Sequence, residues 1–113
     1  MEGYAGSGGV KLVVTPAAQA DFVDIARHVA ELTGNGPRGV AFAHRLRAQC
    51  EKLAELPGTL GRPRPDLGPD LRSFPFGAWL IIFRYGDDRL EIARVLRAKR
   101  NVKAMFRHDL DAE

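Results

Sequence analysis

The sequence predicts an α+β fold of two layers, in which a pair of helices covers one face of a small antiparallel sheet. Residues 16–56 contain two stretches with apolar side chains at the three- and four-residue spacing of helices, separated by Gly34-Asn35-Gly36. Residues 70–96 contain three short runs rich in β-branched and aromatic residues, separated by glycine-containing links. The chain of 113 residues has the size of a single domain.

Residues 10–15 predict a short strand ahead of the helices. Thr15-Pro16 then predicts a helix start, because the threonine side chain can cap the first turn and the missing proline N–H costs nothing there. The glycines at 34 and 36 predict its end. Its expected apolar stripe consists of Phe22, Ile25, Ala26, Val29 and Leu32.

A second helix is expected to begin near Pro37 and to end before Pro57-Gly58. The short turn between the two helices makes them an antiparallel hairpin whose combined stripe needs an apolar surface to cover. Cys50 is the only cysteine, which excludes an internal disulfide, and its apolar helical position indicates a core residue rather than a nucleophile. The expected stripe of this helix consists of Phe42, Leu46, Cys50, Leu53 and Leu56.

Residues 57–69 hold four prolines and three glycines and are predicted to form a rigid crossing loop. A strand over residues 70–76 follows, and residues 78–85 form the expected central strand. Gly86-Asp87-Asp88 then links the central strand to a last strand over residues 90–96, as an antiparallel hairpin. The three strands form a meander.

The run from Trp79 to Phe83 is apolar on both faces of its strand, so both faces of the sheet must be covered. The hairpin can cover one face only. A short helix is predicted over residues 99–107, anchored by Val102 and Phe106, and it could cover part of the other face. A partner segment that folds on binding could cover the remainder.

Residues 1–9 are expected to be a disordered lead or a cloning remnant, residues 10–107 a single domain, and residues 108–113 an acidic tail. No apolar run approaches the roughly 20 residues of a membrane span, so we expect a cytoplasmic protein without a membrane partner. The lone cysteine and scattered histidines lack metal-ligand spacing, and no phosphate-binding loop is evident. We therefore expect no cofactor and no metal.

Positive charge is concentrated in the second half of the chain. Between Arg89 and Arg107, seven Lys and Arg residues face a single acidic residue, Glu91. A patch of this kind suits an anionic partner, either nucleic acid or an acidic protein surface. A charge cluster on a small protein is nevertheless more often a solvated face, and the charge alone does not decide between the two.

Specific motifs resemble the ParE toxins of the RelE/ParE superfamily, the toxic halves of bacterial type II toxin-antitoxin pairs. The resemblance runs from about Val13 to Phe106, and Arg97 and Asn101 depart from residues that family members often have. The matching segments are Thr15-Pro16-Ala17-Ala18 with Asp21, Phe22 and Ile25; Ala41 with Leu46, Leu53 and Leu56-Pro57; Gly61-Arg62-Pro63-Arg64-Pro65-Asp66-Leu67; Leu71-Arg72-Ser73-Phe74; Leu80-Ile81-Ile82-Phe83-Arg84; and Ile92-Ala93-Arg94-Val95-Leu96 through Arg100 to Phe106.

The resemblance implies a RelE/ParE-like toxin that inhibits DNA gyrase and is neutralised by a ParD-like antitoxin in a hetero-oligomeric complex, with nucleic acid contacted only indirectly. The basic segment is the expected target-binding surface: Arg94, Arg97, Lys99, Arg100 and Lys103. Because the central strand is apolar on both faces, we expect Trp79, Ile81 and Phe83 to form the antitoxin-binding surface.

A ribosome-dependent mRNA endonuclease of the RelE kind is the alternative. Such an enzyme needs groups that transfer protons and cations that stabilise the phosphorane charge. The candidate cations are Arg72, Arg84, Arg94 and Arg100. The histidines are poorly placed, since His28 and His44 fall on helices and His108 lies in the tail; Tyr85 and Glu91 are weak substitutes. The preferred interpretation therefore assigns no catalytic residue, and a non-toxic relic that still binds an antitoxin also stays open.

Overall fold

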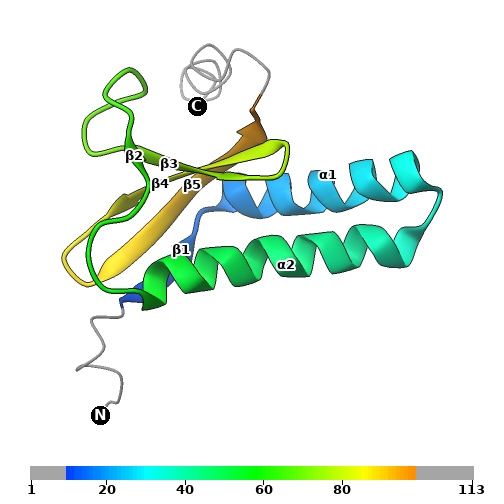
Figure 1. The fold of residues 1–113 in the computed structure, drawn as a ribbon, viewed down its shortest axis with the longest axis horizontal. Helices are drawn as coiled ribbons and strands as arrows, with labels where there is room; N and C mark the ends of the chain where they lie inside the picture. The colour runs from blue at the N-terminus through cyan, green and yellow to red at the C-terminus, as the bar shows by residue number, and fades with distance from the viewer. Residues whose placement is uncertain (1–9, 99–113) are drawn as a thin grey trace.

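The computed structural model describes residues 10–98, which form two layers: a five-stranded sheet and a helical hairpin packed on one of its faces (Figure 1). The fold class predicted from the sequence is confirmed. Along the chain the elements are β1 Lys11–Val14, α1 Pro16–Thr33, α2 Gly36–Glu55, β2 Arg62–Pro63, β3 Arg72–Phe76, β4 Trp79–Tyr85 and β5 Arg89–Arg97.

The predicted antiparallel meander corresponds to β3, β4 and β5, with β4 in the middle. The sheet is wider than predicted, in the order β1-β5-β4-β3-β2. β1 pairs in parallel with β5, and the two residues of β2, inside the predicted crossing loop, pair with β3. β1 pairs with a strand far along the chain, and β2 is only two residues long, so local sequence patterns do not reveal either pairing.

The helix ends lie where the capping signals predicted them. The hydroxyl oxygen of Thr15 accepts a hydrogen bond from the Ala18 N–H at 3.1 Å, with Pro16 in the first turn of α1. Gly34 ends α1 in the left-handed conformation, with φ of 66°, which glycine adopts without steric cost. Asn35 then caps α2 by accepting from the Arg38 N–H at 3.1 Å. The short turn folds α2 back along α1.

The main core lies between the hairpin and the sheet. Its buried side chains come from both helices and from β4 and β5: Ala18, Phe22, Ile25, Leu46, Cys50, Leu53, Ala54, Ile81, Phe83, Leu90, Ile92 and Val95. Two residues of the predicted stripes, Leu32 and Leu56, are exposed instead. Leu32 is 75% exposed, and Figure 1 shows that the free end of the hairpin reaches past the sheet. Leu56 follows the last residue of α2 and is 44% exposed.

The expected antitoxin-binding face of β4 requires a correction. Ile81 and Phe83 are fully buried beneath the helices, and Trp79 packs against the same core. These three residues therefore form the covered face, because side chains of one parity on β4 all point toward the hairpin. The opposite face carries a second, smaller cluster composed of Leu67, Leu71, Ile82 and Leu96, with Leu80 and Ala93 packed against it.

The predicted helix over residues 99–107, the tail over 108–113 and the lead over 1–9 lie outside the described residues. Neither α1 nor α2 combines the length and the apolar character that crossing a bilayer requires. Within residues 10–98, no three His, Cys, Asp or Glu side chains are grouped as a metal site.

Candidate functional site between α1 and β5

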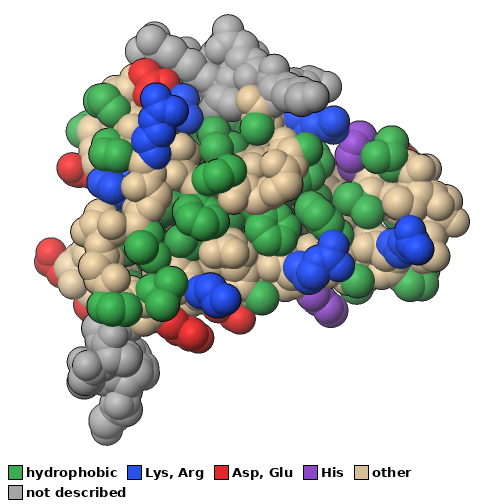
Figure 2. Space-filling view, in the orientation of Figure 1, with side chains coloured by type: hydrophobic (Ala, Val, Ile, Leu, Met, Phe, Trp, Pro, Cys, Tyr) green, Lys and Arg blue, Asp and Glu red, His purple; other side chains and the backbone are tan. Residues whose placement is uncertain are grey.

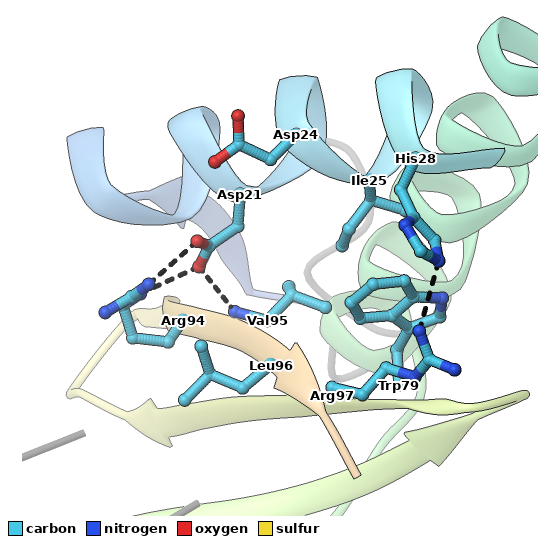
Figure 3. A pocket seen from close by; sticks show the side chains of 9 residues that line it. All are labelled: Asp21, Asp24, Ile25, His28, Trp79, Arg94, Val95, Leu96 and Arg97. Carbon is cyan, nitrogen blue, oxygen red and sulfur yellow. Dashed lines mark hydrogen bonds and ion pairs between the residues drawn. The ribbon is translucent and has the colours of Figure 1, made fainter. Parts of the chain in front are cut away.

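A pocket of about 370 Å³ lies between α1 and the final residues of β5 (Figure 3). It brings together two residues of the predicted target-binding patch, Arg94 and Arg97, with Trp79 at the start of β4. The remaining lining residues are Asp21, Asp24, Ile25 and His28 from α1 and Val95 and Leu96 from β5. The lining therefore combines acidic, basic, aromatic and aliphatic groups.

Asp21 joins the two sides of this pocket. Its carboxylate accepts hydrogen bonds from Nε and Nη2 of Arg94, each at 2.8 Å, and from the backbone N–H of Val95, also at 2.8 Å. β1 ends opposite Ile92, so this edge of β5 continues past its neighbouring strand. The carboxylate satisfies an N–H that a longer β1 would otherwise have paired.

Arg97 stands on the opposite wall from Asp21, as Figure 3 shows. Its guanidinium lies 5.3 Å from the ring centroid of Trp79, and Nη1 lies 3.1 Å from Nε2 of His28. The His28 ring in turn meets the Trp79 ring edge-on at 5.8 Å. Nε of Arg97 is buried and has no hydrogen-bond partner among the described residues. The stack thus fixes a guanidinium beside the pocket with one donor unused.

Comparison with known proteins places this chain in a family. A family model described as "ParE toxin of type II toxin-antitoxin system, parDE" matches residues 12–102. The chain belongs to the ParE toxin family. Toxin ParE3 of Caulobacter vibrioides is 30% identical over 97 residues, which cover 85% of this chain and 94% of that relative.

Two solved toxin-antitoxin structures share the fold of this ParE family member. A chain of the chromosomal ParDE system from P. aeruginosa matches with a TM-score of 0.69 at 23% identity, covering 82% of this chain and 100% of its own. A chain of the RelBE2 toxin-antitoxin complex from Mycobacterium tuberculosis matches with a TM-score of 0.53 at 20% identity, covering 80% and 94%. At these identities the likeness establishes the fold.

Three of the four arginines considered for a nuclease have structural partners in this ParE-family chain. Arg72 donates from Nε to the Leu60 carbonyl at 2.7 Å and from Nη2 to the Gly61 carbonyl at 2.9 Å. Arg84 pairs with Glu91 at 2.8 Å. Arg94 pairs with Asp21 as described above, and Arg100 lies outside the described residues. These contacts hold the crossing loop, the β4–β5 pair and α1 in place.

Tyr85 and Glu91, the weak substitutes for proton-transfer groups, also have partners within the chain. The Tyr85 hydroxyl accepts from the Leu60 N–H at 2.9 Å, and Glu91 is the partner of Arg84. Burial raises the pKa of Cys50 from 9.0 to about 12, so its thiol stays protonated at neutral pH and behaves as the core residue that the sequence predicted.

The expected target-binding patch is described only in part. Arg94 and Arg97 line the same pocket, while Lys99, Arg100 and Lys103 lie outside the described residues. The Arg94 side chain is only 16% exposed and is paired with Asp21, whereas Nε of Arg97 is buried without a hydrogen-bond partner among the described residues.

Sequence reasoning assigned no role to Asp21 or His28 in this site. A signal for Asp21 was present, because it stands beside Phe22 and one turn before Ile25, at the border of the apolar stripe of α1. An acidic residue in such a position must find a partner when the helix packs. No comparable signal identifies His28, whose role depends on Trp79 from a distant strand.

Proposed function

We propose that this protein is the toxin of a type II toxin-antitoxin pair, that it inhibits DNA gyrase, and that a ParD-like antitoxin neutralises it. Membership of the ParE toxin family carries the proposal, because the match spans residues 12–102 and so runs from β1 past the end of β5. The gyrase target follows from the family resemblance already drawn from the sequence.

An antitoxin partner is supported by the two solved structures, one from a ParDE toxin-antitoxin system and one of a RelBE2 toxin-antitoxin complex. Gyrase and antitoxins reside in the bacterial cytoplasm, so we assign the protein to that compartment. The surface of this chain that contacts gyrase is then expected to include the pocket between α1 and β5, where the Arg97 guanidinium lies over the Trp79 ring.

The internal partners of the arginines support an inhibitor over a ribosome-dependent nuclease. A phosphorane would need cations that are available to substrate, whereas Arg72 binds two backbone carbonyls and Arg94 a buried carboxylate. Diverting either group to RNA would leave its present partner unsatisfied, at a cost of about 1–3 kcal/mol for a neutral group and more for a charged one.

The decisive experiment measures two activities of one preparation. The purified chain is added to gyrase in a supercoiling assay, and the same chain is induced in bacteria while the 5′ ends of mRNA are mapped. We expect inhibition of supercoiling, intact mRNA, and restoration of growth when the ParD-like protein from the neighbouring open reading frame is coexpressed. Codon-specific mRNA cleavage with normal gyrase activity would overturn the assignment of the target and favour the nuclease.

A further inference from the structure

His28 on α1 contacts two residues that belong to different strands of the sheet. Trp79, the first residue of β4, and Arg97, the last residue of β5, lie opposite each other in the antiparallel ladder. The Arg97 guanidinium lies 5.3 Å from the Trp79 ring centroid. His28 reaches both groups, with its Nε2 3.1 Å from Nη1 of Arg97 and its ring edge-on to the indole at 5.8 Å (Figure 3). Strand pairing thus brings the arginine and the tryptophan together, and the helix adds the histidine.

The contact with Arg97 defines the protonation of the histidine ring. An arginine side chain has hydrogen-bond donors and no acceptor, and it is always positively charged in proteins. Nε2 of His28 must therefore accept the hydrogen bond, so the ring is neutral and carries its proton on Nδ1. A protonated ring would instead place a donor against a donor and two cations 3.1 Å apart. The hydrogen bond is thus compatible only with a neutral imidazole.

The acceptor for Arg97 is a neutral ring although carboxylates are near. Among the described residues, the charged side chains that line the pocket with His28 are Asp21 and Asp24 from α1 and Arg94 and Arg97 from β5. Both carboxylates are paired with other arginines, and β4 contributes only the uncharged Trp79 ring. A carboxylate in the place of the histidine would orient the guanidinium and also cancel much of its charge. A neutral imidazole orients the guanidinium and leaves its charge for a partner.

We propose that His28 is a positioning residue for target binding. In its neutral form it holds the Arg97 guanidinium over the Trp79 ring, where the guanidinium receives a carboxylate from the surface of the target. Imidazole changes its charge near neutral pH, and protonation of His28 removes the acceptor and releases the guanidinium. This inference rests on the proposed function, since it assumes that the pocket between α1 and β5 contacts gyrase.

The test separates the hydrogen bond of His28 from the packing of its ring. His28→Gln keeps an acceptor, because the side-chain oxygen of glutamine can occupy the place of Nε2, but it loses the aromatic ring. His28→Phe keeps a ring edge against Trp79 and has no acceptor. His44→Phe is the matched control, because His44 lies on α2, is exposed and does not line this pocket. Figure 2 shows one histidine side chain at the α1 edge of the hairpin and another at the α2 edge.

Inhibition of gyrase supercoiling is titrated with each variant at about pH 8, where imidazole is neutral, and folding is checked by thermal unfolding. We expect His28→Gln and His44→Phe to inhibit as the wild type does. His28→Phe should need about fivefold more protein for the same inhibition, which is the loss expected from one hydrogen bond. In an Arg97→Ala background, His28→Gln and His28→Phe should inhibit equally, because the histidine acts only through the arginine.

The isolated chain supplies a second measurement that does not involve gyrase. Trp79 is the only tryptophan in the sequence, so tryptophan fluorescence reports on this pocket alone. Lowering the pH from about 8 to about 5.5 protonates imidazole and should change the Trp79 emission of the wild type and of His44→Phe. The change should be absent from His28→Gln and His28→Phe.

Equal inhibition by folded His28→Gln and His28→Phe in the presence of Arg97 would overturn the inference and leave the proposed function intact. A wild-type Trp79 emission that is the same at both pH values would overturn it as well. So would a change in emission that persists in His28→Gln, since another group would then titrate beside the indole. A wild-type chain that leaves gyrase active would overturn both the proposed target and the role of His28.

Discussion

Asp21 in α1 and Arg94 in β5 are joined by two hydrogen bonds of 2.8 Å across a sequence separation of 73 residues. The side chains are only 10% and 16% exposed, and the same carboxylate also accepts from the Val95 N–H. The Asp21 carboxylate thus holds α1 against the edge of β5. Asp21 and Arg97 line the same pocket, so this contact also fixes one wall of that pocket.

Replacing Asp21 with Asn should destabilise the fold by about 3 kcal/mol, because the substitution leaves the Arg94 guanidinium buried without its counter-charge. The loss is measured by urea unfolding. Asp24→Asn is the matched control on the same helix, since its pair with Arg27 is exposed and should contribute less than about 1 kcal/mol. Equal free energies of unfolding for the two variants would show that the buried pair contributes no more to stability than the exposed pair does.

Gly39 controls how closely the two helices approach. A Cβ at this position would clash with the backbone oxygen of Ala26 and lie 3.1 Å from the Ala30 Cβ. Gly39→Ala should therefore cost about 1–3 kcal/mol, despite the higher helix propensity of alanine. Both effects are measured by thermal unfolding. Gly36→Ala serves as the control, because nothing lies within 4 Å of a Cβ there, and it should be neutral or stabilising. A stabilised Gly39 variant would contradict the close contact of the hairpin.

Local signals in the sequence were sufficient to place the two helices and the central strand. The cap at Thr15, the left-handed residue at Gly34 and the β-rich run at the centre of the sheet each depend on neighbours in sequence, and each lies where it was predicted. The pairing of β1 with β5 depends on segments far apart in the chain, and so does the Asp21–Arg94 ion pair. Local patterns cannot specify such contacts.

The sequence did not show which face of β4 and β5 packs against the helices, and the reason is more specific. Residues 79 to 83 are apolar at every position, so alternation alone does not say which parity faces the helices. On β5 the alternation itself changes: Ile82 pairs with Arg94 and Phe83 with Ile92, so Ala93 is an extra residue in the ladder. Leu90 and Ile92 face the core before the bulge and Val95 after it. A bulge of this kind cannot be read from the apolar pattern.

Cys50 should make stability fall at alkaline pH. Burial raises its pKa from 9.0 to about 12, so between these values the folded state keeps a proton that the unfolded state releases. The unfolded state then binds fewer protons, and the free energy of unfolding decreases by up to about 1.4 kcal/mol per pH unit.

The check is urea unfolding at pH 8, 9 and 10 for the wild type and for Cys50→Ala. The variant is less stable at pH 8 because it leaves a cavity, but it lacks this contribution to the pH dependence, so the two curves should converge as pH rises. Parallel curves would show that the thiol titrates equally in both states.

Arg84 tests the nuclease alternative directly. Its pair with Glu91 is on the surface, with the arginine side chain 55% exposed, so Arg84→Ala should change stability by less than about 1 kcal/mol. For a gyrase inhibitor, the variant should stop growth as the wild type does and leave mRNA intact. Glu91→Gln removes the other half of the pair and is the matched control. mRNA cleavage by the wild type that disappears in a folded Arg84→Ala variant would instead identify a catalytic cation.

The last prediction concerns the basic segment that contains Arg97 and Arg100. Replacing both with Ala should weaken inhibition of gyrase supercoiling while leaving antitoxin affinity largely unchanged, because antitoxin binding is expected to depend more on apolar burial than on these charges. Arg97 is the better-defined member, since the Trp79 ring and His28 hold its guanidinium beside the pocket with Nε unused. Charges at the edge of an interface act mainly on association, so wild-type inhibition should also weaken as salt rises.

Two further variants separate charge from packing. Arg97→Lys keeps the charge but loses the planar stack on Trp79, so it should retain the salt dependence and lose part of the inhibition. Arg27→Ala/Arg47→Ala removes two exposed charges elsewhere and should inhibit as the wild type does. If Arg97→Ala/Arg100→Ala inhibits gyrase as strongly as this control, the basic segment is only a solvated face. The surface that contacts the target would then be sought on the helical hairpin, where Leu32 and Val40 remain 75% and 53% exposed.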